Sequence, residues 1–493
     1  MITSNTVLEA VWDTNTYKVT FKNSDGTEYA KKDVLYNGKV EKPEDTPTPN
    51  EGYTFKHWAT SAGSETEYDF NTPITSDITL SAVCEKLQVF VSFYDGNRLL
   101  SSGYYNWGED IEFPTFSDVG TGCTITKWIL GEDEYYSDPT FNLSYRDEEY
   151  SFVAFITTDL ITINNGSISA TDNLKNSTTI TALNIPHSIN GKIVTAIGDK
   201  AFQDCSSLTS ITVPESVTSI GNSAFEGCTS LSSINIPSNI NSIGYYAFQN
   251  CSSLESIKIP ASCTTIKSYA FYQCKSLQTA DIAEGCTSIG DWAFRECEKL
   301  ESIVVPSSVT SLGNWVIAQC PSLRSADIKA NVKELDKNIF NGDEKLETIC
   351  LSSKISSLNP NMFVNTPSLQ TIEVHAGNAN FLSIDGVLYD KNKTKLICYP
   401  AAKQGDKPDA SFTIPDTVTT IGGFAFTHIQ NLKSIIIPNT VTAIEQLAFY
   451  SCKNRIDVYI NQDESDLFKD AFDGDSKAKV TIHWNSTGPE SQN

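Results

Sequence analysis

A 23-residue period of cysteine and phenylalanine constrains the fold of this chain more than any other feature. Six cysteines follow one another at this spacing: Cys205, Cys228, Cys251, Cys274, Cys297 and Cys320. The position three residues earlier holds Phe202, Phe225, Phe248, Phe271, Phe294 and Ile317, and this column continues at Phe340, Phe363, Phe426, Phe449 and Phe472. A fixed period of this length predicts a solenoid, in which each repeat forms one turn and buries its apolar face against its neighbours.

Other apolar columns keep the same phase. The position five residues before the phenylalanine column is always Ile or Leu, and the position six residues after it is Leu in most repeats. An alternating β-branched pair and a proline then follow, as in Ile211-Thr212-Val213-Pro214. This alternation predicts a short strand that ends at the proline, because proline cannot donate to a sheet. Glycine often follows the isoleucine column, where we expect a tight turn. The next segment, such as residues 223–228, is expected to return the chain as a helical or irregular turn.

The repeat resembles the BspA-like leucine-rich repeat. The resemblance rests on the motif L-x-x-I-x-[IV]-P-x-x-[VI]-x-x-I-G-x-x-A-F-x-x-C and covers about residues 160–484. It implies an α/β-type repeat solenoid with short parallel strands that is mostly β and irregular, which we place at residues 158–484. Residues 485–493 are predicted to be a disordered tail.

The period is interrupted between Phe363 and Phe426. Two apolar strands, Val387–Tyr389 and Leu396–Tyr399, flank a polar turn there and predict a β-hairpin within an insertion at about residues 376–411. Asp385, Asp390 and Asn392 suggest a calcium loop, but the EF-hand spacing and its terminal Glu are missing. A plain hairpin is therefore the preferred interpretation.

The N-terminal third lacks the 23-residue period and contains a longer repeat. Segments 17–21 and 89–93 open two copies, which we place at residues 13–86 and 87–157. They resemble the Listeria–Bacteroides repeat, a small β-grasp-like module, although the second copy is divergent. Residues 2–12 align with residues 74–84, so residues 1–12 are expected to be the last strand of an earlier module. The sequence is therefore interpreted as a piece of a longer protein, in which signal and anchor segments lie elsewhere.

The cysteine column has a structural and a chemical interpretation. Metal sites need ligands that converge, whereas these thiols recur once per turn with no CxxC pair and no phased histidine. Cys263 and Cys286 fill a second column that otherwise holds Val217, Ile240 and Val309. Both columns are therefore predicted to be small apolar residues packed inside the solenoid. No metal site and no cofactor are predicted.

Charge and motif content argue against several functions. The formal net charge of −24 disfavours nucleic acid as a partner, and no apolar run approaches the roughly 20 residues that span a bilayer. None of the five histidines has zinc-protease spacing, and no nucleophile elbow or phosphate-binding loop is present. The chain is therefore predicted not to be an enzyme.

Two columns of the solenoid are candidates for binding. The position two residues before the phenylalanine column is aromatic in four consecutive repeats, as Tyr246, Tyr269, Trp292 and Trp315. It is polar in several other repeats, for example at Lys200 and Ser223, so it is predicted to face solvent. Four adjacent aromatic rings form a platform for a protein or a glycan. The alternative is a ladder of rings that only stabilises the solenoid.

The second candidate is a band of carboxylates on the strands. Its members alternate between two nearby positions in successive repeats: Glu255, Asp281, Glu301, Asp327, Glu347 and Glu373. Such a band attracts a basic ligand. The alternative is an ordinary solvated face of an acidic protein.

These patterns favour a non-catalytic bacterial protein, at the cell surface or secreted, that mediates adhesion through its solenoid. The BspA-like resemblance implies binding of a host or matrix protein, or of another bacterial surface protein. The alternative is a glycan-binding surface protein that uses the aromatic column. An enzyme with a substrate-binding solenoid is a third possibility, and it requires a catalytic domain outside this sequence.

Overall fold

The computed structural model describes residues 14–113, 121–131, 133–136, 141–143, 149–403, 410–452, 454–463, 470–472 and 479–488. It divides into two compact units, one of residues 1–115 and 125–155 and the other of residues 116–124 and 156–493. The predicted strand at residues 1–12 and residues 489–493 of the predicted tail lie outside the described residues. Within the rest of that tail, Asn485 and Ser486 donate backbone hydrogen bonds to Gln462 and Ile460.

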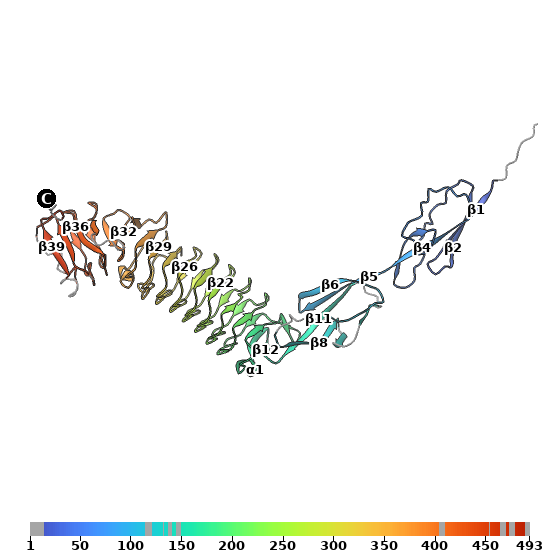
Figure 1. The fold of residues 1–493 in the computed structure, drawn as a ribbon, viewed down its shortest axis with the longest axis horizontal. Coiled ribbons are helices and arrows are strands. Elements are labelled where there is room, and N and C mark those ends of the chain that lie inside the picture. Colours follow the sequence, from blue (N-terminus) through green and yellow to red (C-terminus); the bar gives the residue numbers. More distant parts are fainter. Residues whose placement is uncertain are drawn as a thin grey trace, which may run out of the picture. The chain divides into compact units, whose positions relative to one another are not determined.

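The N-terminal unit contains two sheets of the same topology (Figure 1). The first has the order β2-β1-β4-β3, from β1 (Thr16–Lys22), β2 (Glu28–Leu35), β3 (Tyr53–Ala59) and β4 (Ile78–Lys86). The second has the order β6-β5-β11-β8-β9, from β5 (Gln88–Asp95), β6 (Arg98–Asn106), β8 (Cys123–Leu130), β9 (Asp133–Tyr136) and β11 (Glu149–Thr158). The parallel pairs β1/β4 and β5/β11 correspond. Between β6 and β11 in the chain, β7 (Asp110–Ile111) and β10 (Phe141–Asn142) form a separate antiparallel pair.

The two sheets also bury the same kind of aromatic pair. Phe21 meets Trp58 edge to face at 4.9 Å between ring centroids, and Phe93 meets Trp128 in the same way at 5.2 Å. Both tryptophans are almost fully buried. The two sheets therefore have this strand order and this ring pair in common, while the assignment of residues 87–157 as a divergent second copy stays a prediction.

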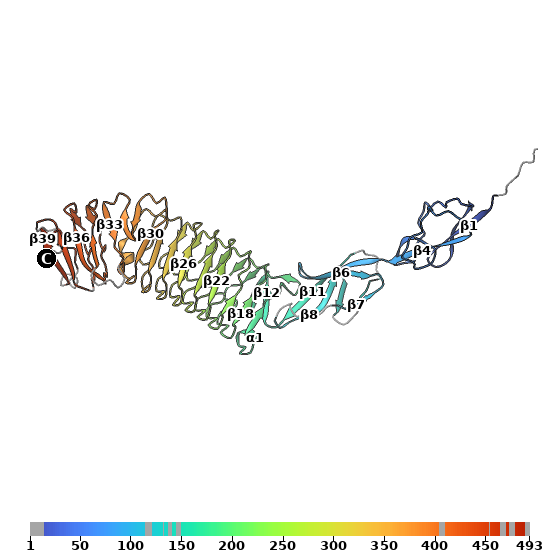
Figure 2. The ribbon, with the colours of Figure 1, turned by 45° about the horizontal axis from the view of Figure 1, so that its top comes forward.

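Two parallel ladders of short strands build the solenoid (Figures 1 and 2). The isoleucine column forms the first, with β17 (Ala196–Ile197), β19 (Ser219–Ile220), β21 (Ser242–Ile243), β23 (Thr265–Ile266), β25 (Ser288–Ile289) and β27 (Ser311–Leu312). The segment before the proline forms the second, which consists of two sheets. The first contains β14 (Ala182–Asn184), β18 (Ser210–Thr212) and β20 (Ser233–Ile234), and the second contains β22 (Ser256–Ile259), β24 (Thr279–Ile282), β26 (Ser302–Val305), β28 (Ser325–Ile328), β29 (Thr348–Leu351) and β30 (Thr371–Val374). Equivalent residues of successive repeats pair directly, as Ile220 does with Ile243.

Other elements close the first turns and form the last ones. The hairpin of β12 (Ile161–Asn164) and β13 (Ser167–Ala170) joins the first ladder, and α1 (Asp172–Lys175), β15 (Ser188–Ile189) and β16 (Lys192–Ile193) lie close by in sequence. The last turns contain β34 (Ala410–Thr413), β35 (Thr420–Ile421), β36 (Leu432–Ile437), β37 (Ala443–Ile444), β38 (Ile456–Ile460) and β39 (Val480–Trp484). Helix in the described residues is limited to α1 and the 3-10 turn η1 (Pro360–Phe363). The predicted solenoid of short parallel strands is confirmed.

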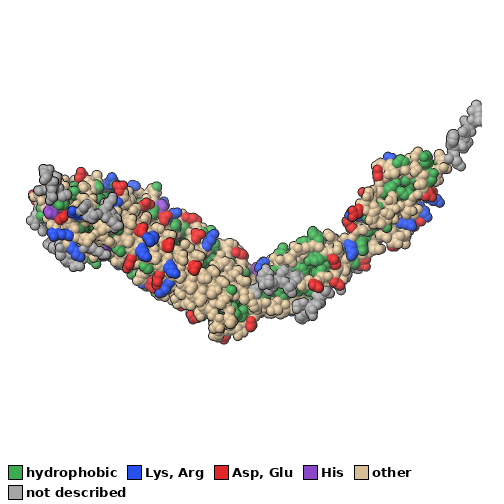
Figure 3. Space-filling view, viewed as in Figure 1, with side chains coloured by type: hydrophobic (Ala, Val, Ile, Leu, Met, Phe, Trp, Pro, Cys, Tyr) green, Lys and Arg blue, Asp and Glu red, His purple; other side chains and the backbone are tan. Residues whose placement is uncertain are grey.

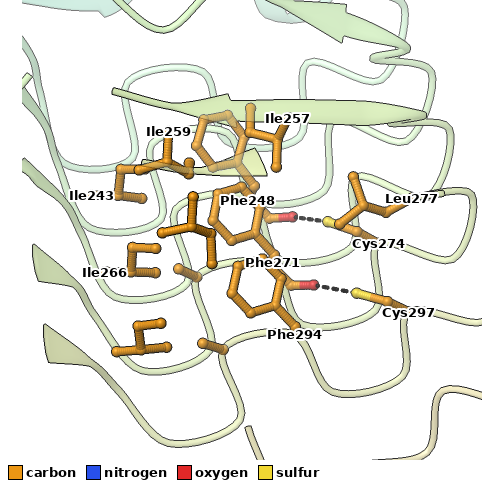
Figure 4. Close-up of a cluster of buried hydrophobic side chains, with 14 of the residues drawn as sticks. Ile243, Phe248, Ile257, Ile259, Ile266, Phe271, Cys274, Leu277, Phe294 and Cys297 are labelled. Atoms are coloured by element: carbon orange, nitrogen blue, oxygen red, sulfur yellow. Dashed lines mark hydrogen bonds between the residues drawn. The ribbon is translucent and has the colours of Figure 1, made fainter. Parts of the chain in front are cut away.

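Phenylalanine rings and thiols fill the interior, as Figure 4 shows. The rings of Phe202, Phe225, Phe248, Phe271 and Phe294 stack at 5.1–5.3 Å between centroids. Beside them, the thiols of the cysteine column from Cys228 to Cys320 donate to the phenylalanine carbonyl of the preceding turn, as Cys274 Sγ does to Phe248 O at 3.2 Å. The carbonyls of Phe202, Phe225, Phe248 and Phe271 also accept the N–H of the cysteine in their own turn. Cysteine therefore combines a small apolar volume with a weak donor, and its predicted interior position is confirmed.

The return segment is irregular, and alternate backbone N–H groups in it donate to the following turn. The residues two before and two after the phenylalanine column have positive φ in most turns, for example Lys200 at 55° and Asp204 at 61°. The N–H groups of Lys200, Phe202 and Asp204 all donate to carbonyls of the next turn. At the start of the solenoid, the Ala170 N–H donates to the Ala201 carbonyl. The segment thus adds a third set of turn-to-turn hydrogen bonds to the two ladders.

The glycine after the isoleucine column does not serve the tight turn that was expected. Gly244 and Gly290 do not have positive φ. A Cβ on Gly244 would lie 2.5 Å from the backbone of Gly221, and one on Gly290 would lie 2.4 Å from the nitrogen of Ser268. These glycines therefore permit close approach of successive turns rather than a left-handed conformation.

The insertion is a three-stranded meander that forms one sheet with the short strands β35 and β37 of the later turns. Its strands are β31 (Phe381–Ile384), β32 (Val387–Asp390) and β33 (Lys395–Cys398). The predicted hairpin corresponds to β32 and β33, and β33 pairs with β35 so that Leu396 lies opposite Ile421. The Asp390 carboxylate accepts from the backbone N–H groups of Thr394 and Lys395 at 2.7 Å each, so it closes the turn.

Candidate ligand-binding surface

The four predicted aromatic residues form one continuous stack, here called the aromatic stack. Tyr246, Tyr269, Trp292 and Trp315 lie ring on ring, with centroid distances of 4.8, 5.4 and 5.9 Å along the series. Tyr246 is 38% exposed, and the other three rings are half-buried. Tyr245, beside the stack in sequence, is 46% exposed and has the Lys267 ammonium 4.9 Å from its ring centroid. The rings are thus partly accessible, and they also stabilise one another.

The backbone under the aromatic stack is left-handed. Its four residues have φ of 57°, 63°, 61° and 54°. Lys200 and Ser223 share this conformation at the same position of earlier turns, so it belongs to the turn rather than to the ring. A left-handed conformation costs roughly 1–2 kcal/mol for a residue with a Cβ, and stacking returns about 0.5–1.5 kcal/mol per aromatic pair. Backbone preference alone therefore does not account for bulky aromatic residues here.

An arginine is fixed against the aromatic stack. The Arg295 guanidinium carbon lies 3.6 Å from the Trp292 ring centroid and 5.1 Å from that of Trp315. Its Nε donates to Gln319 Oε1 at 2.7 Å, and Nη2 lies 3.5 Å from Glu296 Oε1. Tyrosine, tryptophan and arginine are the residues most enriched where interfaces concentrate their binding energy. The sequence columns did not reveal Arg295, because its neighbours at that position are Tyr272 and Ala318.

The predicted acidic band lies on the outer side of the second ladder. In strand register, Asp281 and Asp327 share a column with Lys258, Val304, Cys350 and Glu373. Glu255, Glu301 and Glu347 lie three residues earlier in their repeats, and Arg324 contacts Glu347. On the face that Figure 3 shows, acidic and basic side chains are interspersed over the solenoid. The structure therefore brings the six carboxylates onto one face but places cations among them.

One part of this face gathers three different side chains. Potential ligand atoms of Asp327, Cys350 and His375 all lie within 4.8 Å of one another. His375 Nε2 lies 2.7 Å from Asp327 Oδ1, and Lys329 Nζ lies 3.5 Å from Asp327 Oδ2. Desolvation and the nearby carboxylates raise the pKa of Cys350 to about 11. The group was missed because only Asp327 was considered, although Cys350 follows it by one 23-residue period and His375 follows Cys350 by 25 residues.

The buried thiols are protonated and unreactive at neutral pH. Desolvation raises the pKa of Cys205 to about 11 and that of Cys263 to about 12, and it raises the pKa values of Cys251, Cys274 and Cys297 well above their usual range. The thiolate is the nucleophile and the metal ligand. These cysteines therefore act as packing residues at neutral pH.

Asp343 occupies the cysteine column directly after the unbroken series of six cysteines, and cysteine returns to this column at Cys452. It is fully buried, and its Oδ1 accepts the Cys320 N–H at 2.8 Å. Its Oδ2 has no hydrogen-bond partner among the described residues. Desolvation raises the pKa of this carboxyl well above its usual value. The unbroken series of cysteines is thus followed by a turn in which one oxygen of a buried carboxyl group lacks a hydrogen-bond partner among the described residues.

The described residues include no helix long and apolar enough to cross a lipid bilayer.

Comparison with known proteins identifies the repeats. The BspA type leucine-rich repeat region matches residues 171–284, 195–322, 264–385 and 408–488. The Listeria–Bacteroides repeat domain matches residues 17–83. Two proteins of Evansella cellulosilytica, which carry the provisional names of a Gly-rich membrane protein and a membrane protein, are 29% and 28% identical over 116 and 164 residues. These matches cover 23% and 33% of this chain but only 13% and 22% of those relatives.

Solved structures of bacterial leucine-rich repeat proteins are also similar. A leucine-rich cell surface protein from Faecalibacterium prausnitzii is 24% identical, with a TM-score of 0.42, over 67% of this chain and 94% of that one. A leucine-rich repeat protein from Bacteroides ovatus is 21% identical, with a TM-score of 0.36, over 66% of this chain and 99% of that one. Since the repeat model matches more than half of the residues, the chain belongs to the BspA-type leucine-rich repeat family.

Proposed function

We propose that this chain is a non-catalytic adhesion protein that binds a protein ligand through its solenoid. The observation that carries the proposal is the aromatic stack with Arg295 fixed against it. Four bulky rings are kept on a left-handed backbone that would suit smaller residues better. Mutual stacking explains part of this arrangement, and the exposed edges at Tyr245 and Tyr246 supply a surface for a partner.

A protein ligand suits this surface better than a glycan. Sugars pack on the open faces of aromatic rings, whereas each inner ring of the aromatic stack has both faces covered by its neighbours. The edges that remain carry the positive side of the ring quadrupole, and they favour carbonyl and carboxylate oxygens or other ring faces. Rigid rings and a fixed guanidinium also lose little conformational entropy on binding.

The strand face contributes selectivity in this proposal. A basic surface on the partner is favoured by the exposed carboxylates of Asp281, Glu301 and Glu373. Acidic groups of the partner would face the exposed cations Lys258 and Arg324. Mixed charges of this kind orient an encounter more than they add affinity. The location that fits this function is the cell surface or the extracellular space, in line with the names of the Evansella relatives. The partner is then a host, matrix or bacterial surface protein.

The test is binding by Trp292→Ala and Trp315→Ala variants. Loss of two adjacent aromatic anchors is expected to weaken binding by about 2–4 kcal/mol, since such residues dominate interface energetics. The measurement is biolayer interferometry against a panel of extracellular matrix and bacterial surface proteins, with a glycan array in parallel. Tyr459→Ala is the matched control, because Tyr459 is a half-buried ring that stacks on His483 elsewhere in the solenoid.

Three outcomes separate the possibilities. Binding of a panel protein that the tryptophan variants lose and the control keeps supports the proposal. Glycan binding lost in the same variants supports the alternative of a glycan-binding surface protein. Protein binding that survives both substitutions in folded protein, checked by circular dichroism, contradicts the role given to the aromatic stack.

A further inference from the structure

We propose that Asp327, Cys350 and His375 form a binding site for one Zn²⁺ ion on the outer face of the second ladder. The three side chains come from three consecutive turns, on β28, on β29 and directly after β30. Asp327 lies opposite Cys350 in strand register, and Cys350 lies opposite Glu373, two residues before His375. A site built in this way links three turns.

The donor set matches zinc rather than calcium or magnesium. A thiolate sulfur, an imidazole nitrogen and a carboxylate oxygen are the ligands that Zn²⁺ takes in proteins. Calcium and magnesium take oxygen ligands and leave thiols aside. Glu373, beside Cys350 in register, offers a fourth oxygen, and water is the other candidate for that position.

The spacing of the donors is close to what coordination needs. Zinc bonds of about 2.0–2.3 Å in a tetrahedron place donor atoms roughly 3.3–3.6 Å apart. The three donor atoms here already lie within 4.8 Å of one another. His375 Nε2 and Asp327 Oδ1, now 2.7 Å apart, would separate slightly to admit the ion. Rotation about side-chain bonds suffices for these changes, because all three residues are only half-buried.

Packing does not account for Cys350. The other cysteines of the repeats are buried, and the thiols of Cys251 and Cys274, for example, meet a phenylalanine carbonyl. Cys350 instead lies in the outward column that holds Lys258, Asp281 and Val304 in earlier turns. It thus lies on a solvent-facing surface and fills no interior space.

The chemistry of binding is simple. Zn²⁺ replaces the thiol proton of Cys350, which passes to solvent, and no oxidant or reductant takes part. The Asp327–His375 hydrogen bond gives way to two metal bonds, while Lys329 stays beside the outer carboxylate oxygen of Asp327. In the second and third of the linked turns, Asp343 and Thr366 occupy the position that cysteine holds in the preceding turns. The ion would therefore reinforce a stretch of solenoid that lacks the buried thiols.

Cobalt substitution tests the site. The full chain, kept reduced with a non-thiol reductant, is titrated with Co²⁺ and followed by absorption spectroscopy. We expect one equivalent to give a thiolate-to-cobalt charge-transfer band with tetrahedral ligand-field bands, and one equivalent of Zn²⁺ to remove them. Cys350→Ser should abolish the charge-transfer band, and His375→Gln should lower the affinity at least about tenfold.

Two control variants make the result specific. His483→Gln removes a comparable pair, in which His483 Nε2 lies 3.1 Å from Asp457 Oδ1 without a cysteine in the group. Cys84→Ser removes a half-exposed thiol of the N-terminal unit. Both should bind as the parent chain does. Absence of a thiolate band in the parent chain, or its persistence in folded Cys350→Ser, overturns the proposal.

Discussion

Cysteine occupies two contrasting regions of this solenoid. In the interior, Cys228, Cys251 and Cys274 are fully buried and each donates to the carbonyl of the phenylalanine one turn earlier. On the strand face, Cys350 is half-buried between an aspartate and a histidine. Cys228, Cys251 and Cys274 share one position of the 23-residue repeat, whereas Cys350 lies seven residues beyond the equivalent position of its own repeat, which Asp343 holds. The position within the repeat, rather than the residue type, therefore decides whether a thiol lies in the packed interior or on the strand face.

Shortening a side chain to alanine is expected to change the free energy of unfolding far more in the interior than on the strand face. Phe271→Ala removes a ring that stacks between Phe248 and Phe294, and it should lower the free energy of unfolding by about 3–5 kcal/mol. Val304→Ala, at a 44% exposed position of the strand face, should change it by less than about 0.5 kcal/mol. Urea denaturation measures both. Similar losses in the two variants would mean that the interior is not the main source of stability.

Alkaline pH should destabilise the interior through its thiols. An unfolded cysteine titrates near pH 9.0, whereas burial keeps the folded pKa values of Cys251 and Cys274 well above that. The folded chain thus holds more protons above pH 9, so stability falls as the pH rises, by up to about 1.4 kcal/mol per pH unit for each thiol. The double variant Cys251→Ala/Cys274→Ala should flatten this slope between pH 9 and 11.

The slope is measured by denaturation at several pH values. Cys84→Ala, at a half-exposed position, is the control and should leave it unchanged. An unaltered slope in the double variant would show that the interior thiols ionise without unfolding, which contradicts their assignment as packing residues.

A smaller change in the free energy of unfolding is expected at Asp343, which interrupts the cysteine column after Cys320. Asp343→Cys replaces a buried carboxyl, whose Oδ2 lacks a partner among the described residues, by the residue of the preceding turns. It should raise the free energy of unfolding by about 1–3 kcal/mol at neutral pH. The gain should shrink at low pH, because the raised pKa of Asp343 means that this carboxyl costs stability only after the pH rises above its unfolded value of 3.8.

Thermal unfolding at pH 7 and pH 4 provides the measurement for Asp343→Cys. Asp281→Cys makes the same change on the strand face, where the side chain is exposed, and should be close to neutral. A loss of stability in Asp343→Cys would indicate that the buried carboxyl has a partner or a role that the turn geometry does not reveal.

The sequence predicted the solenoid well because its signals are local and repeated. The phenylalanine, isoleucine and cysteine columns follow from the period, and the strands before Pro214 and its equivalents follow from alternation. The left-handed positions were missed, although Asp204, Asn250 and Gly227 lie at one of them and are residue types that favour it. The glycine column was interpreted as a turn because a sequence cannot show that two turns approach closely there.

The candidate sites were harder to predict, since they depend on contacts between turns. The aromatic column was visible, but Arg295 packs on it from a position with no phased pattern. The acidic band was visible as well, but its cations at Lys258 and Arg324 occur once each. His375 reaches Asp327 across an intervening strand, so a single-sequence search for local metal-ligand spacing does not find the pair.

The one-way hydrogen bonds of the return segments make the two ends of the solenoid chemically different. The N–H groups of Lys200, Phe202 and Asp204 all point to the following turn, so an uncovered leading end offers acceptors and an uncovered trailing end offers donors. Two leading ends cannot satisfy each other, whereas a trailing end fits the leading end of another copy. Polymers with such polarity grow head to tail unless they are capped. By donating from Ala170 to Ala201, the first hairpin covers part of the acceptor end and so leaves fewer acceptors there for another copy.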